Sequence, residues 1–89
     1  MKATKKPVVI DYFHYNYNLD ELNAWVTGLG DNFHDKFIFE EGPEKLKVKT
    51  LEGTSYDVTN NHTIIRGVKG EYYPCVKDIF LETYDTYEP

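Results

Sequence analysis

The sequence predicts an α+β domain in which one amphipathic helix packs on a curled, mostly antiparallel sheet of five or six short strands. Three patterns support this fold class: a helix-start signal near residue 18, an alternation of apolar and basic residues after residue 44, and clusters of turn residues between short apolar segments. The 89 residues, 40% of them hydrophobic, are sufficient for a single domain over residues 1–89. We expect Asp85–Pro89 to form a frayed tail.

The first predicted strand covers residues 6–15, which are rich in β-branched and aromatic side chains and contain no glycine. Pro7 fits the beginning of this strand because proline lacks the N–H group that a sheet ladder needs. The next segment, residues 16–30, carries the signals of a helix.

Asn18 is the expected N-cap of that helix, with Glu21 placed to complete a capping box. Tyr17 precedes the cap and is expected to pack on Leu22. Apolar residues at helical spacing predict one face against the sheet: Leu19, Leu22, Trp25, Val26 and Leu29. Gly28 or Gly30 is expected to end the helix in the left-handed conformation.

A hairpin is predicted after residues 33–39, where breaking residues on both sides leave room for at most a short strand. Its first strand alternates apolar or small residues with lysines: Leu46, Val48 and Thr50 against Lys45, Lys47 and Lys49. A two-residue loop would place Val48 opposite Asp57 and mix the two faces, so we expect a three-residue loop over residues 51–53, with Gly53 at positive φ. This loop pairs Leu46 with Val58, Val48 with Tyr56, Thr50 with Thr54, and Lys47 with Asp57.

The last third of the sequence predicts a turn at residues 60–62, a strand over Thr63–Lys69, and a turn at Gly70. Residues 71–73 are expected to pair back, with an aromatic ring covering Gly67, and Pro74 is expected to end that ladder. Residues 75–80 are interpreted as helical, and residues 81–84 as an extended edge. The side chains expected to point inward from the helical segment are Val76, Ile79 and Phe80.

The charge and the cysteine content of the chain exclude several classes of function. The net charge is −5, and residues 11–44 carry eight acidic residues against one lysine, which disfavours nucleic-acid binding. Cys75 is the one cysteine, so no disulfide forms within the chain and a reduced, intracellular setting is expected. The apolar run at residues 8–10 is too short for an export signal or a membrane span, so no membrane partner is expected.

Catalytic and metal patterns are weak. Cys75 with His62 or His14 as base would suit a thiol enzyme, but a lone cysteine most often packs as a small apolar side chain. His14, His34 and His62 lie 20 and 28 residues apart, which is not the short spacing of a metal site. We therefore predict no enzymatic activity, no metal and no cofactor.

Tyrosine is the best functional indication. The eight tyrosines exceed what a small core needs, and tyrosine is favoured where a protein surface meets a partner. The Gly67–Gly70 turn, with Lys69, is a weaker candidate for a phosphate or nucleotide site beside Tyr72 or Tyr73. The candidate binding residues are Tyr15, Tyr17, Tyr56, Lys69, Glu71, Tyr72 and Tyr73.

Residues 64–75 read IIRGVKGEYYPC, and together with residues 78–80 and 83–84 they resemble a widespread family of small proteins encoded in bacteriophage and prophage genomes. The resemblance covers roughly residues 6–15 and 45–84 and leaves residues 16–44 unmatched. Family members commonly carry Pro-Gly-Asp before the two isoleucines, whereas this chain has residues 60–63 as Asn-Asn-His-Thr. The resemblance implies a phage protein in the host bacterial cytoplasm and assigns no activity.

The expected function is a small non-enzymatic accessory protein that binds a host or phage protein and inhibits a host defence or regulatory factor. The alternative is a small-molecule or nucleotide-binding module that uses the Gly67–Gly70 turn and its neighbouring tyrosines. The sequence leaves the oligomeric state open.

Overall fold

The fold is described by a computed structural model that covers residues 1–3 and 8–86. It is an α+β structure with two three-stranded antiparallel sheets, of strand order β1-β5-β6 and β2-β3-β4. In chain order the elements are β1 (Asp11–His14), α1 (Leu19–Gly28), α2 (Phe33–Lys36), β2 (Phe37–Ile38), η1 (Pro43–Lys45), β3 (Lys47–Lys49), β4 (Ser55–Asp57), β5 (His62–Arg66), β6 (Tyr72–Val76) and α3 (Lys77–Thr83).

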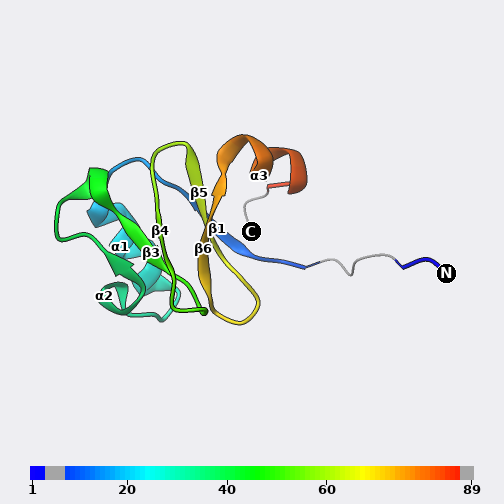
Figure 1. The fold of residues 1–89 in the computed structure, drawn as a ribbon, viewed down its shortest axis with the longest axis horizontal. Helices are drawn as coiled ribbons and strands as arrows, with labels where there is room; N and C mark the ends of the chain where they lie inside the picture. Colours follow the sequence, from blue (N-terminus) through cyan, green and yellow to red (C-terminus); the bar gives the residue numbers. More distant parts are fainter. Residues whose placement is uncertain (4–7, 87–89) are drawn as a thin grey trace.

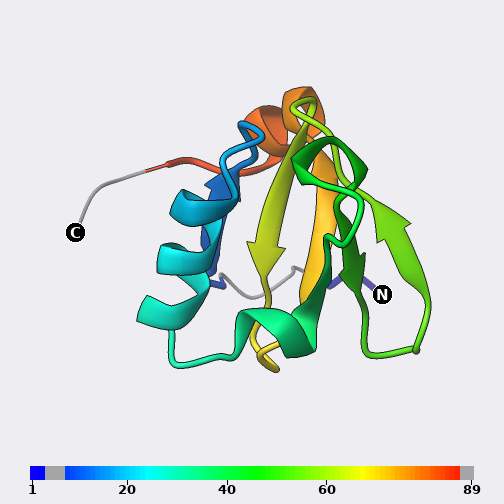
Figure 2. The same ribbon diagram turned by 90° about the vertical axis from the view of Figure 1, so that its left-hand side faces the viewer.

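The first sheet is covered on both faces. Figure 1 shows α1, α2 and the second sheet on one side of β1, β5 and β6, and α3 on the other side. Figure 2 shows α1 running beside β1, with the second sheet beyond β6. The main core lies between the two sheets and α1, and its buried members are Tyr15, Leu22, Val26, Phe33, Phe37, Leu46, Val48, Val58, Ile64 and Tyr72. Ile65 and Phe80 are also buried but lie outside this cluster.

The prediction of one curled sheet is wrong, because β6 contacts β3 and β4 without sharing a ladder with them. Pro74 gives the physical reason. It pairs with Ile64 at a position between the hydrogen-bonded pairs of β5 and β6, so its nitrogen points away from β5 and toward the outer edge. Proline has no N–H to offer there, so the centre of that edge lacks a donor for another strand.

Pro74 therefore does not end the ladder, which was the expectation; β6 continues through it to Val76. Cys75 and Val76 are accordingly in a strand and not in a helix. The helix α3 begins at Lys77 and includes residues 81–83, which were expected to be extended. Phe80 is buried as predicted, whereas Val76 and Ile79 are exposed.

The start of α1 follows the prediction in part. The Asn18 side chain accepts a hydrogen bond from the Glu21 N–H (3.1 Å), as expected of an N-cap. The Glu21 carboxylate does not return the bond; it accepts one from the Asn16 side-chain amide (2.7 Å), and the Asn18 N–H donates to the Asn16 side chain instead (3.1 Å). Gly30, at φ +90°, is the glycine that turns the chain after α1.

The predicted hairpin is confirmed in its register and its loop. Val48 pairs with Tyr56 and Lys47 with Asp57, Gly53 has φ +83°, and the Val58 N–H donates to the Leu46 carbonyl (3.0 Å). Lys47 and Asp57 face each other, but the one ion pair between described residues is elsewhere, between Arg66 and Asp31. Within residues 33–39, where at most a short strand was expected, the structure has the helix α2 over residues 33–36, followed by the short strand β2.

The first strand is shorter than predicted. β1 begins at Asp11, because its partner Arg66 is the last residue of β5. Residues 8–10 continue beyond the ladder with Val8 and Val9 exposed. The placement of Lys6 and Pro7 in the strand lies outside the described residues, as does the end of the predicted tail at residues 87–89. None of the described helices is long and apolar enough to cross a membrane.

Candidate functional site

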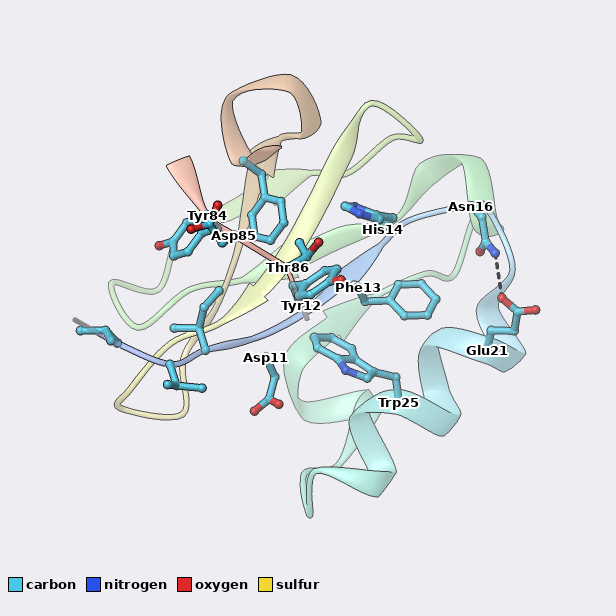
Figure 3. A pocket seen from close by; sticks show the side chains of 14 residues that line it. Asp11, Tyr12, Phe13, His14, Asn16, Glu21, Trp25, Tyr84, Asp85 and Thr86 are labelled. Atoms are coloured by element: carbon cyan, nitrogen blue, oxygen red, sulfur yellow. Dashed lines mark hydrogen bonds between the residues drawn. The ribbon is translucent and has the colours of Figure 1, made fainter. Parts of the chain in front are cut away.

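A groove of about 640 Å³ follows β1 on the surface of the described residues (Figure 3). Residues 8–14 form its floor. Asn16, Glu21 and Trp25 line it on the side of α1, and Phe80 with residues 84–86 line it on the side of α3. Segments more than 70 positions apart in the sequence therefore form one site.

The backbone of β1 offers hydrogen-bonding groups to this groove. The Tyr15 N–H donates to the carbonyl of His62, its cross-strand partner (3.2 Å). Bonded and non-bonded pairs alternate along an antiparallel ladder, so Tyr12 and His14 occupy the non-bonded positions. Their N–H and C=O groups point away from β5, toward the free edge.

Aromatic side chains form a wall on each face of β1. On the α1 face, the Phe13 ring stacks on Trp25, with ring centroids 5.5 Å apart. On the opposite face, Phe80 packs on Tyr12 (4.9 Å) and on Tyr84 (5.0 Å). Figure 3 shows Tyr12 between the Trp25 and Tyr84 rings, and Phe13 beside Trp25 on the side away from Tyr84. A chain lying along β1 would meet an aromatic surface on both sides.

The groove is acidic. Asp11, Glu21 and Asp85 line it and are exposed, whereas no lysine or arginine is among its described lining residues. Arg66 pairs with Asp11 in the ladder, but its Nε donates to Asp31 (2.9 Å).

His14 is the titratable base of the groove. Its Nδ1 lies 2.7 Å from Oγ1 of the fully buried Thr63, and its ring meets Phe80 edge-on. Burial, and to a lesser extent the nearby Lys77 ammonium, lower the pKa of His14 below its ordinary value of 6.5. His14 is therefore neutral at pH 7.

The predicted tyrosine surface is wrong for two of its members. Tyr15 and Tyr72 are each 1% exposed, so they are core residues. The Tyr15 hydroxyl donates to the Pro43 carbonyl (2.6 Å), and the Tyr72 hydroxyl donates to Asp31 Oδ2 (2.7 Å). Buried tyrosines need such partners, and these two find them inside the molecule.

The other predicted binding residues do not form one surface. Tyr56 is 44% exposed on β4, and the half-buried Tyr17 donates a hydrogen bond to Asn60. Tyr73 lies on the α3 face of the first sheet, where burial and the neighbouring Tyr84 raise its pKa to about 12. The structure thus separates these tyrosines onto different elements.

The Gly67–Gly70 turn already holds an anion of its own. The Glu71 carboxylate accepts a hydrogen bond from the Lys69 N–H (3.0 Å) and fills the space beside the Gly67 Cα. Tyr73 also borders Gly67, as the expected aromatic cover would, although Glu71 lies closer. A phosphate at this turn would have to displace the carboxylate, so the turn offers no ready cradle.

Cys75, which was expected to pack as a small apolar side chain, is half-buried on β6. Its Sγ lies 3.6 Å from the Val76 carbonyl oxygen. Among residues 1–3 and 8–86, no three His, Cys, Asp or Glu side chains come together as a metal site would require.

Sequence reasoning assigned Trp25 to the core and did not identify the groove. Trp25 does pack on the core, but its other side borders the groove. The available signal was in residues 8–14, which contain no lysine, proline or glycine of the kind that usually protects a sheet edge.

Comparison with known proteins gave no match, whether with protein-family models, curated proteins or solved structures. The resemblance of residues 64–75 to a phage family therefore stays a prediction.

Proposed function

We propose that this chain is a non-enzymatic protein-binding domain that takes an extended segment of a partner protein as an added strand on β1. The observation that carries the proposal is the pair of outward-facing backbone positions, Tyr12 and His14, at the floor of a groove with aromatic walls. Strand addition uses such main-chain groups for affinity and the flanking side-chain surfaces for specificity.

The other long edge of the first sheet is less suited to strand addition. The outer edge of β6 carries Pro74 and lies against β3 and β4. The β1 edge has neither feature, and the exposed Val8 and Val9, at 44% and 76%, extend it beyond the ladder. A partner strand would cover these apolar side chains together with the edge.

The phage setting and a host or phage protein as the partner remain part of this proposal. They are supported by the sequence resemblance and by the small size of the chain. Inhibition of a host defence or regulatory factor would follow if the partner uses the docked segment in its own function.

A displayed library of random nonapeptides, selected on the immobilised full-length chain, would supply test ligands. We expect a selected peptide to slow amide hydrogen exchange at Tyr12 and His14 and to change the fluorescence of Trp25, the one tryptophan. Selection that yields no peptide protecting these two amides would contradict the proposal.

A matched pair of variants tests the edge itself. Ile10 directly precedes the ladder, and an extended continuation of β1 would direct its N–H toward the free edge, as at Tyr12. Ile10→Pro removes this donor and should weaken peptide binding at least tenfold, whereas Ile10→Val keeps the donor and should bind like the parent chain. Equal binding by the two variants would place the peptide elsewhere.

A further inference from the structure

The electrostatics of the groove indicate what kind of segment it accepts. Resting on the proposed function, we infer that the groove takes an extended segment in which basic residues alternate with apolar residues. The basic side chains lie on the α1 face of β1 and the apolar side chains lie on the α3 face. Side chains alternate between the two faces of a strand, so each face of the groove selects every second residue.

The α1 face combines negative charge with an indole ring. Asp11 and Glu21 both line the groove here, together with Trp25. Figure 3 shows the Trp25 ring between the Asp11 and Glu21 side chains. The Glu21 carboxylate receives a hydrogen bond from the neutral Asn16 amide and forms no ion pair with a residue that the structure describes. A lysine or arginine side chain would gain both charge attraction and a cation–π contact with Trp25.

The cation across the ladder from Asp11 is already paired. Arg66 lies across the ladder from Asp11, and its Nε is 2.9 Å from Asp31 Oδ2. Hydrogen bonds from Tyr72 and Arg66 hold the pKa of Asp31 below its ordinary value, so Asp31 stays charged at neutral pH and keeps Arg66 engaged. The charge of Asp11 and Glu21 is therefore available to a partner.

The α3 face has a different character. Phe80, Tyr12 and Tyr84 form its wall, and His14 is neutral at pH 7. The Lys77 ammonium lies near His14 on this side, where Asp85 also lines the groove. With mixed charge and a continuous aromatic surface, this face favours apolar side chains over charged ones.

A second copy of the chain fits the groove less well. It would bring its own Asp11 to a groove already lined by three carboxylates, and each copy carries a net charge of −5. The repulsion between these like charges would oppose the association of two copies. A basic segment of another protein has the complementary charge.

Three capped nonapeptides test the inference on the full-length chain: alternating Lys and Val, the same peptide with Glu for Lys, and the same peptide with Thr for Lys. Trp25 fluorescence gives the affinity, and amide exchange at Tyr12 and His14 gives the location. We expect the lysine peptide to bind at least tenfold more tightly than the threonine peptide at low salt, with the difference shrinking as salt rises. The glutamate peptide should bind most weakly.

Charge-removing variants assign the effect to the α1 face. The Asp11→Asn, Glu21→Gln double variant should lose most of the preference for lysine over threonine. Glu52→Gln, which removes an exposed charge in the β3–β4 loop, should keep it. If Glu52→Gln also loses the preference for the lysine peptide, the preference depends on the net charge of the chain and not on the groove, and the inference is overturned.

The outcomes separate the two proposals. If the lysine and threonine peptides bind equally and both protect Tyr12 and His14, strand addition stands and the charge pattern is wrong. If none of the three peptides protects these amides at millimolar concentration, both proposals fail. If sedimentation shows a dimer that Ile10→Pro abolishes, the occupant of the edge is a second copy, and the inference is overturned.

Discussion

The carboxylate of Glu71 occupies the space that a side chain at position 67 would need. A Cβ built on Gly67 would overlap this carboxylate and approach the Tyr73 ring to 3.3 Å. The φ of Gly67 is not in the left-handed region, so a side chain there would be opposed by contact alone, and the flexible Glu71 carboxylate would have to move away to admit it. The turn from β5 to β6 depends on this pair, because Glu71 also accepts the Lys69 N–H.

Gly67→Ala should destabilise the protein by about 0.5–1.5 kcal/mol, because the Glu71 carboxylate must move aside and give up its hydrogen bond from the Lys69 N–H. Urea denaturation measures the change. Gly28→Ala provides the control, because a Cβ there meets nothing within 4 Å and alanine favours the helical conformation. An equal loss in both variants would show that overlap with Glu71 is not the cause.

The contact between Gly67 and Glu71 predicts that the effects of substituting the two residues on stability are not additive. Glu71→Ala should cost about 0.5–1.5 kcal/mol through the lost hydrogen bond to the Lys69 N–H. In that background, Gly67→Ala should cost less than in the parent chain, because the space is then free. Strictly additive losses in a double-mutant cycle would contradict the proposed overlap.

The hydrogen bonds to Asp31 should make stability depend on acid pH. Because Tyr72 and Arg66 lower the pKa of Asp31 in the folded state, its contribution is present above the unfolded value of 3.8 and is lost as the pH falls through the folded-state pKa. Asp31→Asn should therefore be less stable than the parent at pH 7, with a difference that shrinks at lower pH. Denaturation at a series of pH values measures this difference, and a constant difference would contradict it.

Tyr72→Phe removes one of the two bonds to Asp31 without creating a large cavity. We expect a loss of about 1.5 kcal/mol at pH 7, because the bond to a charged acceptor is stronger than a neutral one. Tyr56→Phe is the matched control, since Tyr56 is exposed on β4 and its hydroxyl should contribute little. Chemical denaturation of both variants checks the comparison.

The lowered pKa of His14 should make the stability of the protein depend on pH in the range just below neutral as well. Its folded-state pKa is lowered, so the unfolded chain takes up the proton first; stability is complete above pH 6.5 and declines as the pH falls toward the folded-state value. Lys77→Met should raise the pKa of His14 in an NMR titration, because it removes the nearby cation. Lys69→Met, on the exposed β5–β6 turn, should leave it unchanged.

Ionisation of the buried Tyr15 hydroxyl should lower the stability of the protein at alkaline pH. Burial raises its pKa from 10 to about 12, so its contribution is present below pH 10 and is lost as the pH rises toward 12. Tyr15→Phe should cost about 1 kcal/mol at pH 7 through the lost bond to Pro43, and it should flatten the decline between pH 10 and 12. Denaturation of the variant and the parent at matched pH values tests both effects.

The sequence by itself determined the local features. The Asn18 cap, the glycine turn after α1 and the register of the β3–β4 hairpin each depend on residues within a dozen positions. Their geometry follows from backbone preferences and side-chain periodicity, which are properties of a short segment. These predictions are confirmed for that reason.

Only the tertiary structure decided the burial of the tyrosines, the division into two sheets and the groove. Tyr15 and Tyr72 are buried because partners 28 and 41 positions away satisfy their hydroxyl groups. Pro74 stays within β6 because the ladder register turns its nitrogen outward. The groove brings residues 8–14 against residues 80–86. Distances between such remote segments depend on how the elements pack, and no local pattern encodes them.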